Sequence, residues 1–349
     1  MKNELPLISI VIPVFNTERY LTDCLNSVCL QTYSNFQVIL VNDASTDGSL
    51  NIIRDFIEKD DRFILINLEN NVGRCLARNV ALENINGDFV VFIDSDDILE
   101  PNYLEILVRA AINNKADIAV CNYRLFSIND THLTKPENST ETLHVAGVDI
   151  FFRSVFSLQL DQRLVTGGFL WNKLINKKVL EEAEGGFPET QGAEDEFFFF
   201  LLKKYITTVV FIPEFLYRYR QRDDSVSRGT QGKSFIARTV VSRFRLLKYC
   251  EDEKQILLAH TFCIQVCIFF VLSTILHRNV SSKDISQCLP YCQKALLWVN
   301  QGQYLPILSK KFSKFKSILL LAKIPNCWFL LYFFANRVIH FYKIWQFFK

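Results

Sequence analysis

The sequence has no pair of cysteines separated by only two residues, although its 349 residues include ten cysteines. Such pairs are the usual mark of zinc ribbons and thiol redox sites, so both classes are disfavoured. We interpret the cysteines as reduced and mostly structural, which fits the cytoplasm. The five histidines also lack metal-ligand spacing, and none is assigned to a metal. Internal repeats and low-complexity segments are absent as well.

Acidic residues are missing from the C-terminal stretch, residues 285–349. Nine of the chain's 39 Lys and Arg residues lie there, which leaves 30 basic against 37 acidic residues in the rest. Aromatic residues are interleaved with these cations, as is typical of a helix that lies in a membrane interface. We therefore expect this tail to dock on an anionic membrane surface. A basic tail can also bind nucleic acid, but the many phenylalanines and the lack of clustered arginine argue against that partner.

No clear secretion signal or membrane-spanning run is present. Lys2 precedes an apolar stretch, but Glu4 and Pro6 interrupt it and no small-residue cleavage site follows, so a first core strand is favoured. Residues 256–276 are mostly apolar and long enough to span a membrane. Because they include His260 and Gln265, we favour a buried or partner-facing helix. Together with the tail, these features predict a cytoplasmic protein, peripheral on the inner face of the cell membrane.

Apolar runs alternate with amphipathic stretches over the first hundred residues. Strands are predicted at 7–14, 36–41, 63–68 and 89–93, and helices at 17–31, 50–57 and 74–84. We expect the first strand to stop at Pro13, which has no N–H for the ladder. Because the strands are apolar throughout, they fit a parallel sheet with both faces covered by helices. The predicted fold class is therefore α/β, with a Rossmann-like, mostly parallel sheet.

The rest of the chain carries weaker patterns. Helices are predicted at 103–114, 147–157 and 197–204, strands at 117–123, 209–212 and 215–218, and a polar loop or hairpin insertion at 127–142. After Gly232 the pattern is helical throughout, which predicts a C-terminal helical extension.

Three carboxylates, Asp94, Asp96 and Asp97, directly follow the apolar strand 89–93. Like charges this close raise one another's pKa unless a cation neutralises them. Hard oxygen ligands at the end of a strand suit Mg²⁺ or Mn²⁺, which usually bridge to substrate phosphates. The alternative is a polar turn, with Asp97 as the N-cap of the next helix and Pro101 in its first turn.

Polar clusters also follow the other predicted strands. They are Phe15-Asn16, Asp43 and Asn71-Val72-Gly73. The carboxyl ends of parallel strands meet at one edge of the sheet, where ligands of open α/β sheets bind. We therefore expect one ligand site built from all of these clusters.

Several motifs in this order carry a family resemblance. They are Val11-Ile12-Pro13-Val14-Phe15-Asn16, Val41-Asn42-Asp43-Ala44-Ser45-Thr46-Asp47-Gly48, Asn71-Val72-Gly73 with Ala77-Arg78-Asn79, Asp94-Ser95-Asp96-Asp97, and Glu194-Asp195. Over about the first two-thirds of its length, the chain resembles a family 2 glycosyltransferase with the GT-A fold. The resemblance implies a nucleotide-sugar-binding half at 1–105 and an acceptor-binding half at 106–230. The composition of the remainder, 231–349, predicts the membrane-associating region.

The resemblance implies inverting transfer of a sugar from a nucleotide diphosphate, most often UDP, with Mn²⁺ or Mg²⁺. The acceptor would be a hydroxyl of a saccharide or a lipid-linked molecule, as in polysaccharide biosynthesis. Carried over by position, the nucleotide-sugar-binding residues are Pro13, Phe15, Asn16, Glu18, Asp43, Arg78, Asp94, Ser95 and Asp96, and the metal ligands are Asp96 and Asp97. Pro13 and Phe15 would line the nucleobase site, and Arg78 would brace it. Asp43 would accept from the base, and it could also cap the following helix.

For catalysis, the resemblance implies Asp195 as the general base, with Glu194 as its neighbour that orients or binds the acceptor. The alternative is that acidic residues here only complement the dipole of a helix N-terminus. Trp171 and Lys173 resemble the acceptor side, although a core tryptophan is equally compatible. The arginines in 217–222 could grip a diphosphate or close a lid, or simply be solvated.

Three other functions remain open at this stage. One is a non-catalytic nucleotide-sugar-binding or membrane scaffold protein, which retention of every acidic motif argues against. Nucleotidyl transfer would need a glycine-rich, basic loop after the first strand, and 13–18 has none. Hydrolysis by paired carboxylates would not explain the polar clusters at the strand ends, which resemble a nucleotide-binding site. A homo-oligomer is possible, but no pattern in the sequence decides it.

Overall fold

The structure is a computed structural model that describes residues 5–127, 143–148, 150–151, 168–183, 186–188 and 194–222. The chain divides into two compact units, 1–189 with 194–223 and 190–193 with 224–349, and every described residue belongs to the first. The predicted membrane-associating region and the helix at 256–276 lie outside the described residues, as do most of the insertion at 127–142 and of the helix at 147–157. In the described part, no helix is long and apolar enough to cross a membrane.

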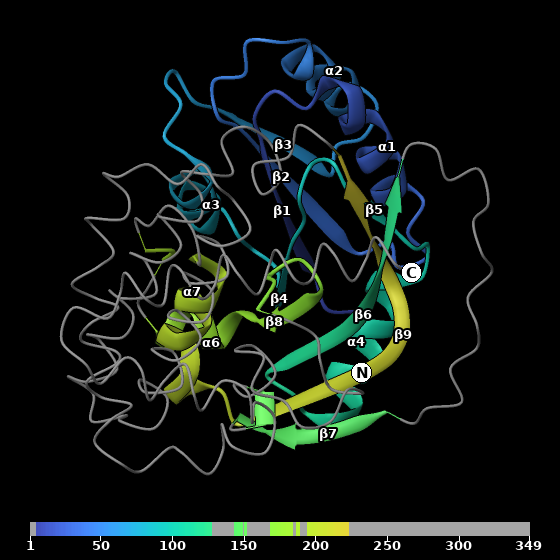
Figure 1. The fold of residues 1–349 in the computed structure, drawn as a ribbon, viewed down its shortest axis with the longest axis vertical. Coiled ribbons are helices and arrows are strands. Elements are labelled where there is room, and N and C mark those ends of the chain that lie inside the picture. The colour runs from blue at the N-terminus through green and yellow to red at the C-terminus, as the bar shows by residue number, and fades with distance from the viewer. Residues whose placement is uncertain are drawn as a thin grey trace, which may run out of the picture. The chain divides into compact units, whose positions relative to one another are not determined.

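Four parallel strands form the N-terminal half of the sheet. The elements are β1 (Ile8–Val14), α1 (Glu18–Cys29), β2 (Phe36–Asn42), α2 (Ser49–Ile57), β3 (Phe63–Asn67), α3 (Arg74–Leu82) and β4 (Phe89–Phe92). The strands lie in the order β3-β2-β1-β4 (Figure 1). Every pairing among them is parallel, so their carboxyl ends meet at one edge. The α/β class predicted from the apolar runs is confirmed.

Helices cover both faces of this half because side chains alternate along each strand. Ile8, Ile10, Ile12 and Val14 of β1 belong to one buried core, which they share with apolar residues of α1 and of α4 (Tyr103–Asn114). The opposite face contacts α3, which lies against β1 and β2. In Figure 1, α1 and α2 lie on the other side of the strands from α3.

The second half of the sheet is mixed. After β5 (Ile98–Leu99) and α4 come β6 (Ile118–Ser127), β7 (His144–Gly147), β8 (Lys173–Asn176), α6 (Lys177–Glu182), α7 (Glu194–Leu202), a 3₁₀ turn at Lys203–Tyr205 and β9 (Thr208–Gln221). The described strands form one nine-stranded sheet, in which β4-β8-β6-β9-β5 continues from β1 and β7 pairs with β9. β4 pairs with β1 on one side and β8 on the other, so it joins the two halves.

Two expected strand boundaries were wrong. β1 runs through Pro13 to Val14. Its pairing with β2 continues to Val14, whereas its pairing with β4 ends at Val11. The missing N–H of Pro13 would face β4, where no ladder hydrogen bond is needed beyond Val11. The two short strands predicted at 209–212 and 215–218 are the single strand β9, which continues through Pro213. The β6–β9 register shifts between Cys121 and Tyr123, and this bulge accommodates the proline.

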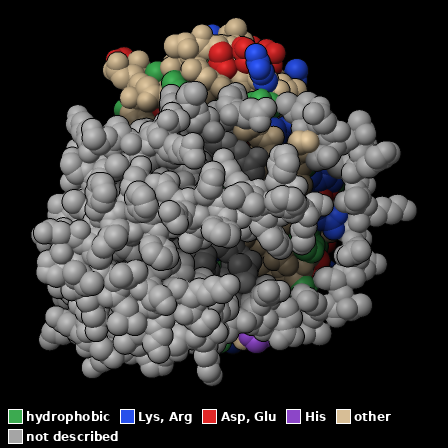
Figure 2. Space-filling model, in the orientation of Figure 1, with side chains coloured by type: hydrophobic (Ala, Val, Ile, Leu, Met, Phe, Trp, Pro, Cys, Tyr) green, Lys and Arg blue, Asp and Glu red, His purple; other side chains and the backbone are tan. Residues whose placement is uncertain are grey.

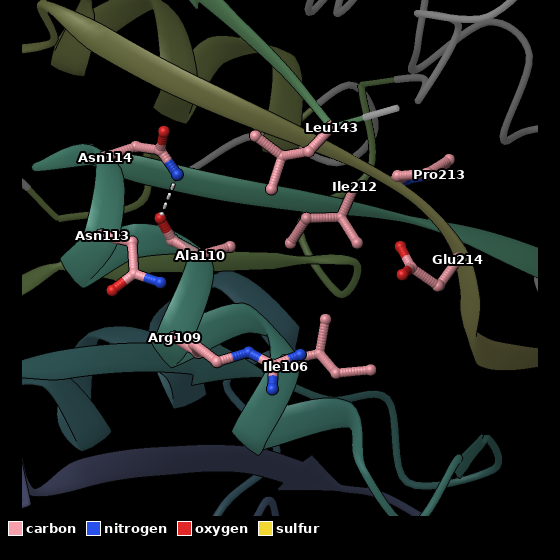
Figure 3. A pocket seen from close by; sticks show the side chains of 9 residues that line it. All are labelled: Ile106, Arg109, Ala110, Asn113, Asn114, Leu143, Ile212, Pro213 and Glu214. Carbon is pink, nitrogen blue, oxygen red and sulfur yellow. Dashed lines mark hydrogen bonds between the residues drawn. The ribbon is translucent and has the colours of Figure 1, made fainter. Parts of the chain in front are cut away.

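Two features of the described surface lie away from the strand-end edge, a small pocket and an area of mixed charge. A small pocket of about 140 Å³ lies between α4 and β9, lined by Ile106, Arg109, Ile212 and Glu214 among others (Figure 3). None of the predicted site residues lines it. On the face seen in Figure 2, acidic and basic side chains are mixed over the α2 end of the first unit, as expected of a solvated surface.

Candidate active site

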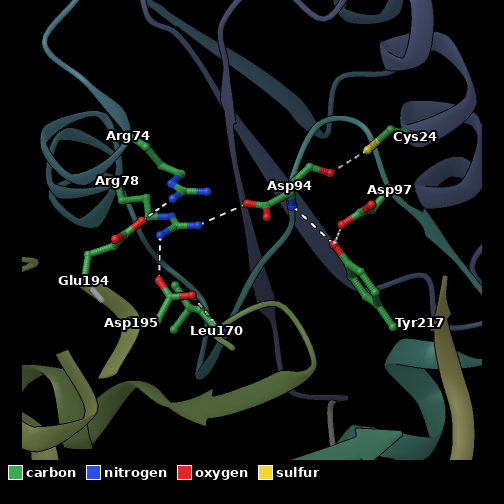
Figure 4. A network of polar contacts seen from close by, with 9 residues as sticks. All are labelled: Cys24, Arg74, Arg78, Asp94, Asp97, Leu170, Glu194, Asp195 and Tyr217. Atoms are coloured by element: carbon green, nitrogen blue, oxygen red, sulfur yellow. Dashed lines mark hydrogen bonds and ion pairs between the residues drawn. The ribbon is translucent and has the colours of Figure 1, made fainter. Parts of the chain in front are cut away.

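The loop after β4 brings its acidic side chains to the strand-end edge. The Ile93 N–H still donates to the Val11 carbonyl at 2.9 Å, and the chain leaves the sheet directly afterwards. Asp94 Oδ1 pairs with Arg78 Nη2 at 3.1 Å, and Asp94 is 18% exposed. The loop is therefore anchored to the sheet while one carboxylate is directed toward α3 (Figure 4).

Asp97, in the same loop, is fully buried. Its Oδ2 accepts from the Tyr217 hydroxyl at 2.7 Å, and its Oδ1 accepts from the Arg220 N–H at 2.8 Å. Burial raises the pKa of Asp97, and the neighbouring Asp96 and Asp94 raise it further. Both oxygens are thus engaged by β9, which makes Asp97 the residue that fastens the carboxylate loop to that strand. Its predicted role as a metal ligand would require one of these bonds to open.

Arg220 of β9 and Arg222, which directly follows this strand, contact Asp96. Arg222 Nε lies 2.8 Å from Asp96 Oδ2, and Arg220 Nε donates to the Asp96 carbonyl at 2.7 Å. Burial raises the pKa of the Asp96 carboxyl, and the Arg222 charge opposes that rise. Arg220 is 6% exposed and also pairs with Asp23 at 3.0 Å. The arginine run is therefore part of the site and does not form a solvated surface, which was the alternative.

Two arginines of α3 meet the acidic start of α7. Arg78 is 1% exposed, and its Nη1 pairs with Asp195 Oδ1 at 3.0 Å while its Nη2 holds Asp94. One turn earlier, Arg74 pairs with Glu194. Burial would raise the pKa of Glu194, but Arg74 and Arg78 outweigh it and hold that pKa below its usual range. Two helices far apart in sequence are thus joined by alternating charges (Figure 4).

Asp195, the predicted general base, is held at both oxygens. Besides Arg78 on Oδ1, its Oδ2 accepts from the Leu170 N–H at 3.2 Å. Its side chain is still 20% exposed. Burial raises the pKa of Asp195, and Arg78 opposes that rise. A carboxylate that is fixed, partly open and more basic than an ordinary aspartate is well suited to accept a proton.

Asp43 holds the loop that precedes α3. Its two carboxylate oxygens accept from the Val72 N–H at 2.7 Å and the Gly73 N–H at 2.9 Å, and Asp43 is 3% exposed. Gly73 has φ +87°, the left-handed region that the sequence predicts for it and that favours glycine. Asp43 therefore positions the start of α3. Arg78, which we expected to brace the nucleobase pocket, contacts Asp94 and Asp195 from the same helix.

The remaining predicted nucleotide-side residues lie at the ends of β1 and β4. Phe15 is 46% exposed and Pro13 is half-buried. Asn16 Oδ1 accepts from the Thr46 N–H at 2.8 Å, and Glu18 Oε2 accepts from the Gly48 N–H at 2.6 Å. The buried Ser95 hydroxyl lies 3.1 Å from that of Thr17. These bonds join the loops after β1, β2 and β4, so the predicted residues do share one edge.

On the acceptor side, the two predicted residues are buried. Trp171 is 3% exposed and stacks on Phe169, Tyr217 and Tyr219. Lys173 is fully buried and donates to the Phe169 carbonyl and to Asn172 Oδ1. Burial lowers the pKa of Lys173 to about 7, and Asp195 opposes that shift. Trp171 is thus a core side chain, and the aromatic ring that reaches the surface there is Phe169, which is 38% exposed.

Sequence reasoning missed Arg74, Tyr217 and Phe169 as members of the site. Arg74 could have been found, because it lies four residues before Arg78 and so on the same face of α3. Tyr217 is the first residue of the arginine run already singled out. Phe169 has no sequence signal of its own, since only the tertiary structure shows that its neighbours are buried while its ring is exposed.

The carboxylates of the loop fit a divalent cation in part. In the described part of the chain, no three His, Cys, Asp or Glu side chains are arranged to hold a metal ion. Asp94 and Asp96, however, are partly exposed and have only one oxygen each in an ion pair, with Arg78 and Arg222. A Mn²⁺ or Mg²⁺ ion bound by one or two carboxylates takes its other ligands from water and phosphate. This geometry favours Asp94 over Asp97 as the companion of Asp96.

Comparisons with known proteins agree with this geometry. Residues 9–182 match the family described as Glycosyl transferase family 2. The chain is 34% identical over 235 residues to the putative glycosyltransferase EpsH of Bacillus subtilis, with 66% of each protein covered. It is 30% identical to the glycosyltransferase GlyG of Streptococcus pneumoniae, over 68% of this chain and 78% of GlyG. The matched region thus spans about two-thirds of the length of EpsH.

Among solved structures, the chain resembles S. aureus TarS 1–349 in complex with UDP-GlcNAc. The TM-score is 0.66 at 20% identity, covering 95% of this chain and 91% of that one. The sheet and its covering helices have the GT-A-type fold of that structure. The chain belongs to glycosyl transferase family 2.

Proposed function

We propose that this protein is an inverting glycosyltransferase that moves a sugar from a nucleotide diphosphate, with UDP as the nucleotide, to a hydroxyl of a saccharide or lipid-linked acceptor. The observation that carries the proposal is the Arg78 guanidinium. It joins Asp94, at the strand-end edge of β4, to Asp195, at the start of α7, so that the predicted donor side and the predicted base lie one side chain apart.

Asp195 would act as the general base. As the acceptor oxygen attacks the anomeric carbon on the face opposite the nucleotide, its proton passes to a carboxylate oxygen of Asp195. The Leu170 N–H and Arg78 hold that carboxylate in one orientation. Because a single displacement reverses the configuration at the reacting carbon, this arrangement of base and donor supports inversion.

The nucleotide would leave as a diphosphate carrying negative charge. Arg220 of β9 and Arg222, which directly follows it, would supply cations beside Asp96, where such charge would develop. A divalent ion held by Asp94 and Asp96 would neutralise the same charge. TarS, which shares the fold, has been crystallised with UDP and with UDP-GlcNAc, which supports a UDP-sugar donor here.

The test measures UDP release from a panel of UDP-sugars with saccharide acceptors, followed by the anomeric configuration of the product by NMR. Asp195→Asn is expected to reduce transfer by a factor on the order of 10² to 10⁴ while leaving UDP binding nearly unchanged. Glu196→Gln, one residue along the same helix, is the matched control. A product that retains the donor's configuration, or an Asp195→Asn enzyme that loses UDP binding to the same degree, would contradict the proposal.

We also propose that residues 285–349 dock the enzyme on the inner face of the cell membrane, where a lipid-linked acceptor would lie. The support is the absence of acidic residues there and the interleaved aromatic and basic side chains. Truncation after Lys316 is expected to shift the protein from the membrane to the soluble fraction. An unchanged distribution would dismiss this part of the proposal.

A further inference from the structure

We propose that Phe169 is an acceptor-recognition residue, whose exposed ring binds the apolar face of the acceptor's terminal pyranose and directs its hydroxyl group toward Asp195. The inference rests on the proposed function and adds to it the chemical class of the acceptor end and the residue that recognises it.

The first observation is position. The Leu170 N–H donates to Asp195 Oδ2 at 3.2 Å, so the residue before it lies next to the predicted base (Figure 4). Phe169 is 38% exposed, whereas Leu170 and Trp171, which follow it, are 0% and 3% exposed. One aromatic ring is therefore presented to solvent beside a carboxylate that can accept a proton.

The second observation is rigidity. The Phe169 ring is stacked on Trp171, with centroids 4.9 Å apart and planes 17° apart, and it meets the edge of Tyr123 at 5.6 Å. Trp171 in turn stacks on Tyr217 at 4.3 Å, which places the exposed ring at the end of a packed aromatic column. Lys173, fully buried, donates to the Phe169 carbonyl and fixes its backbone as well. A ring held in this way loses little conformational freedom when a ligand covers it.

The third observation is the polarity around the ring. A lipid chain needs a contiguous apolar surface, but Leu170 and Trp171, which follow Phe169, are buried, and the Leu170 N–H is bonded to the Asp195 carboxylate. A pyranose matches this combination, because the C–H groups on one face of the ring can pack on an aromatic face while its hydroxyl groups meet polar side chains. The lipid portion of a lipid-linked acceptor would therefore be bound elsewhere.

The experiment uses the full-length protein with UDP and the diamagnetic ion Mg²⁺ and measures saturation-transfer NMR on four probes. The probes are methyl β-D-glucopyranoside, methyl β-D-galactopyranoside, methyl N-acetyl-β-D-glucosaminide and methyl α-D-mannopyranoside. In the wild type, at least one probe is expected to receive saturation on the C–H protons of one ring face. Phe169→Ala is expected to weaken binding of that probe on the order of tenfold.

Three further variants make the result specific. Phe169→Trp is expected to retain the signal, because it keeps a flat aromatic face, and Phe169→Leu is expected to lose it although it keeps apolar bulk and folding. Phe215→Ala removes a phenylalanine of similar exposure, 37%, which packs under Arg124, and is expected to change nothing. The UDP signal serves as an internal control in every sample.

The outcomes separate this inference from the proposed function. If UDP binds but no probe receives saturation, or if Phe169→Ala or Phe169→Leu keeps the wild-type signal, Phe169 is not the sugar platform and the proposed transfer is unaffected. If UDP itself does not bind to the wild type, the proposed function fails and the inference fails with it.

Discussion

Arg78 and Asp195, 117 residues apart in the sequence, form an ion pair of 3.0 Å in which the guanidinium is almost completely buried. The same guanidinium also holds Asp94 at 3.1 Å. Three charged groups, one guanidinium and two carboxylates, therefore depend on one another, with little help from solvent. Removing one of them leaves the others uncompensated, and this sets the first two predictions.

Arg78→Met is expected to lower the free energy of unfolding by about 3 kcal/mol, because two partly buried carboxylates lose their cation. Chemical denaturation measures the change. In the double variant Arg78→Met with Asp195→Asn, the loss should be smaller than the sum of the two single losses, because the unpaired charge at 195 is gone. Lys177→Met, which breaks the exposed pair with Glu181, should cost less than about 1 kcal/mol. Additive losses would show that the pair contributes nothing to stability.

The pH dependence of turnover should report Asp195. A base must be ionised to accept a proton, and burial raises the pKa of this carboxyl. Activity is therefore expected to fall, as the pH is lowered, at a higher pH than for an ordinary aspartate. Because Arg78 opposes the rise, Arg78→Met should move this acidic limb to still higher pH. The measurement is kcat/KM against pH, and a limb that moves to lower pH would contradict the assignment.

Asp96→Asn is expected to weaken Mn²⁺-dependent binding of UDP by at least about tenfold, because the ion loses an anionic ligand. Titration calorimetry with and without Mn²⁺ measures the effect. Asp60→Asn, which removes the partner of Arg62 on the surface, provides the control and should leave UDP binding unchanged. UDP binding that is equally tight in Asp96→Asn, with the same response to Mn²⁺, would remove Asp96 from the metal site.

Tyr217→Phe tests the attachment of the carboxylate loop to β9. The variant deletes the hydroxyl that donates to Asp97 at 2.7 Å in a fully buried setting. A loss of stability of about 1–3 kcal/mol is expected, because a buried acceptor is left without its donor. Tyr33→Phe deletes a bond to the neutral Pro6 carbonyl and should cost less. Equal decreases in melting temperature for the two variants would indicate that the hydrogen bond to Asp97 stabilises the protein no more than the bond to Pro6 does.

Lys173 should make stability depend on pH. Burial lowers its pKa to about 7 from the ordinary 10.5, so between these values the unfolded chain binds more protons than the folded one. Stability is therefore expected to rise as pH increases from about 7 toward 10.5, by up to about 2 kcal/mol over the first two pH units. Lys173→Met should lack this rise. The measurement is the free energy of unfolding of both proteins, by denaturant, across that pH range. The same pH dependence in both would refute the prediction.

The sequence predicted the first half of the fold closely because its strands are continuous apolar runs that need no knowledge of their partners. Strand β4, for example, was expected at 89–93 and spans Phe89–Phe92. Strand β9 was predicted as two strands, 209–212 and 215–218, whereas it continues through Pro213 with the extra residues of a bulge in β9 itself, opposite β6. No local pattern in the sequence shows that bulge. The two-residue strand β5 is too short to leave any periodic signal.

For the site, the sequence predicted which carboxylates gather but not which cations meet them. Asp94 and Asp195 were both expected at one edge, and Arg78 joins them there. The pairing of Asp96 with Arg222 depends on β9 lying beside the carboxylate loop, which no local pattern contains. For the same reason the sequence left Trp171 open between the acceptor side and the core, and the structure encloses its ring among other aromatic rings.

Strand β9 pairs with β6 over most of its length, with β7 near its start and with β5 near its end. It also carries Tyr217 and Arg220, which hold Asp97. The carboxylate loop is therefore attached to a strand of the sheet and is not expected to unfold independently of it. Freeing the carboxylate loop means detaching β9, which is paired with strands on both sides, so we expect this loop to open only together with that part of the sheet.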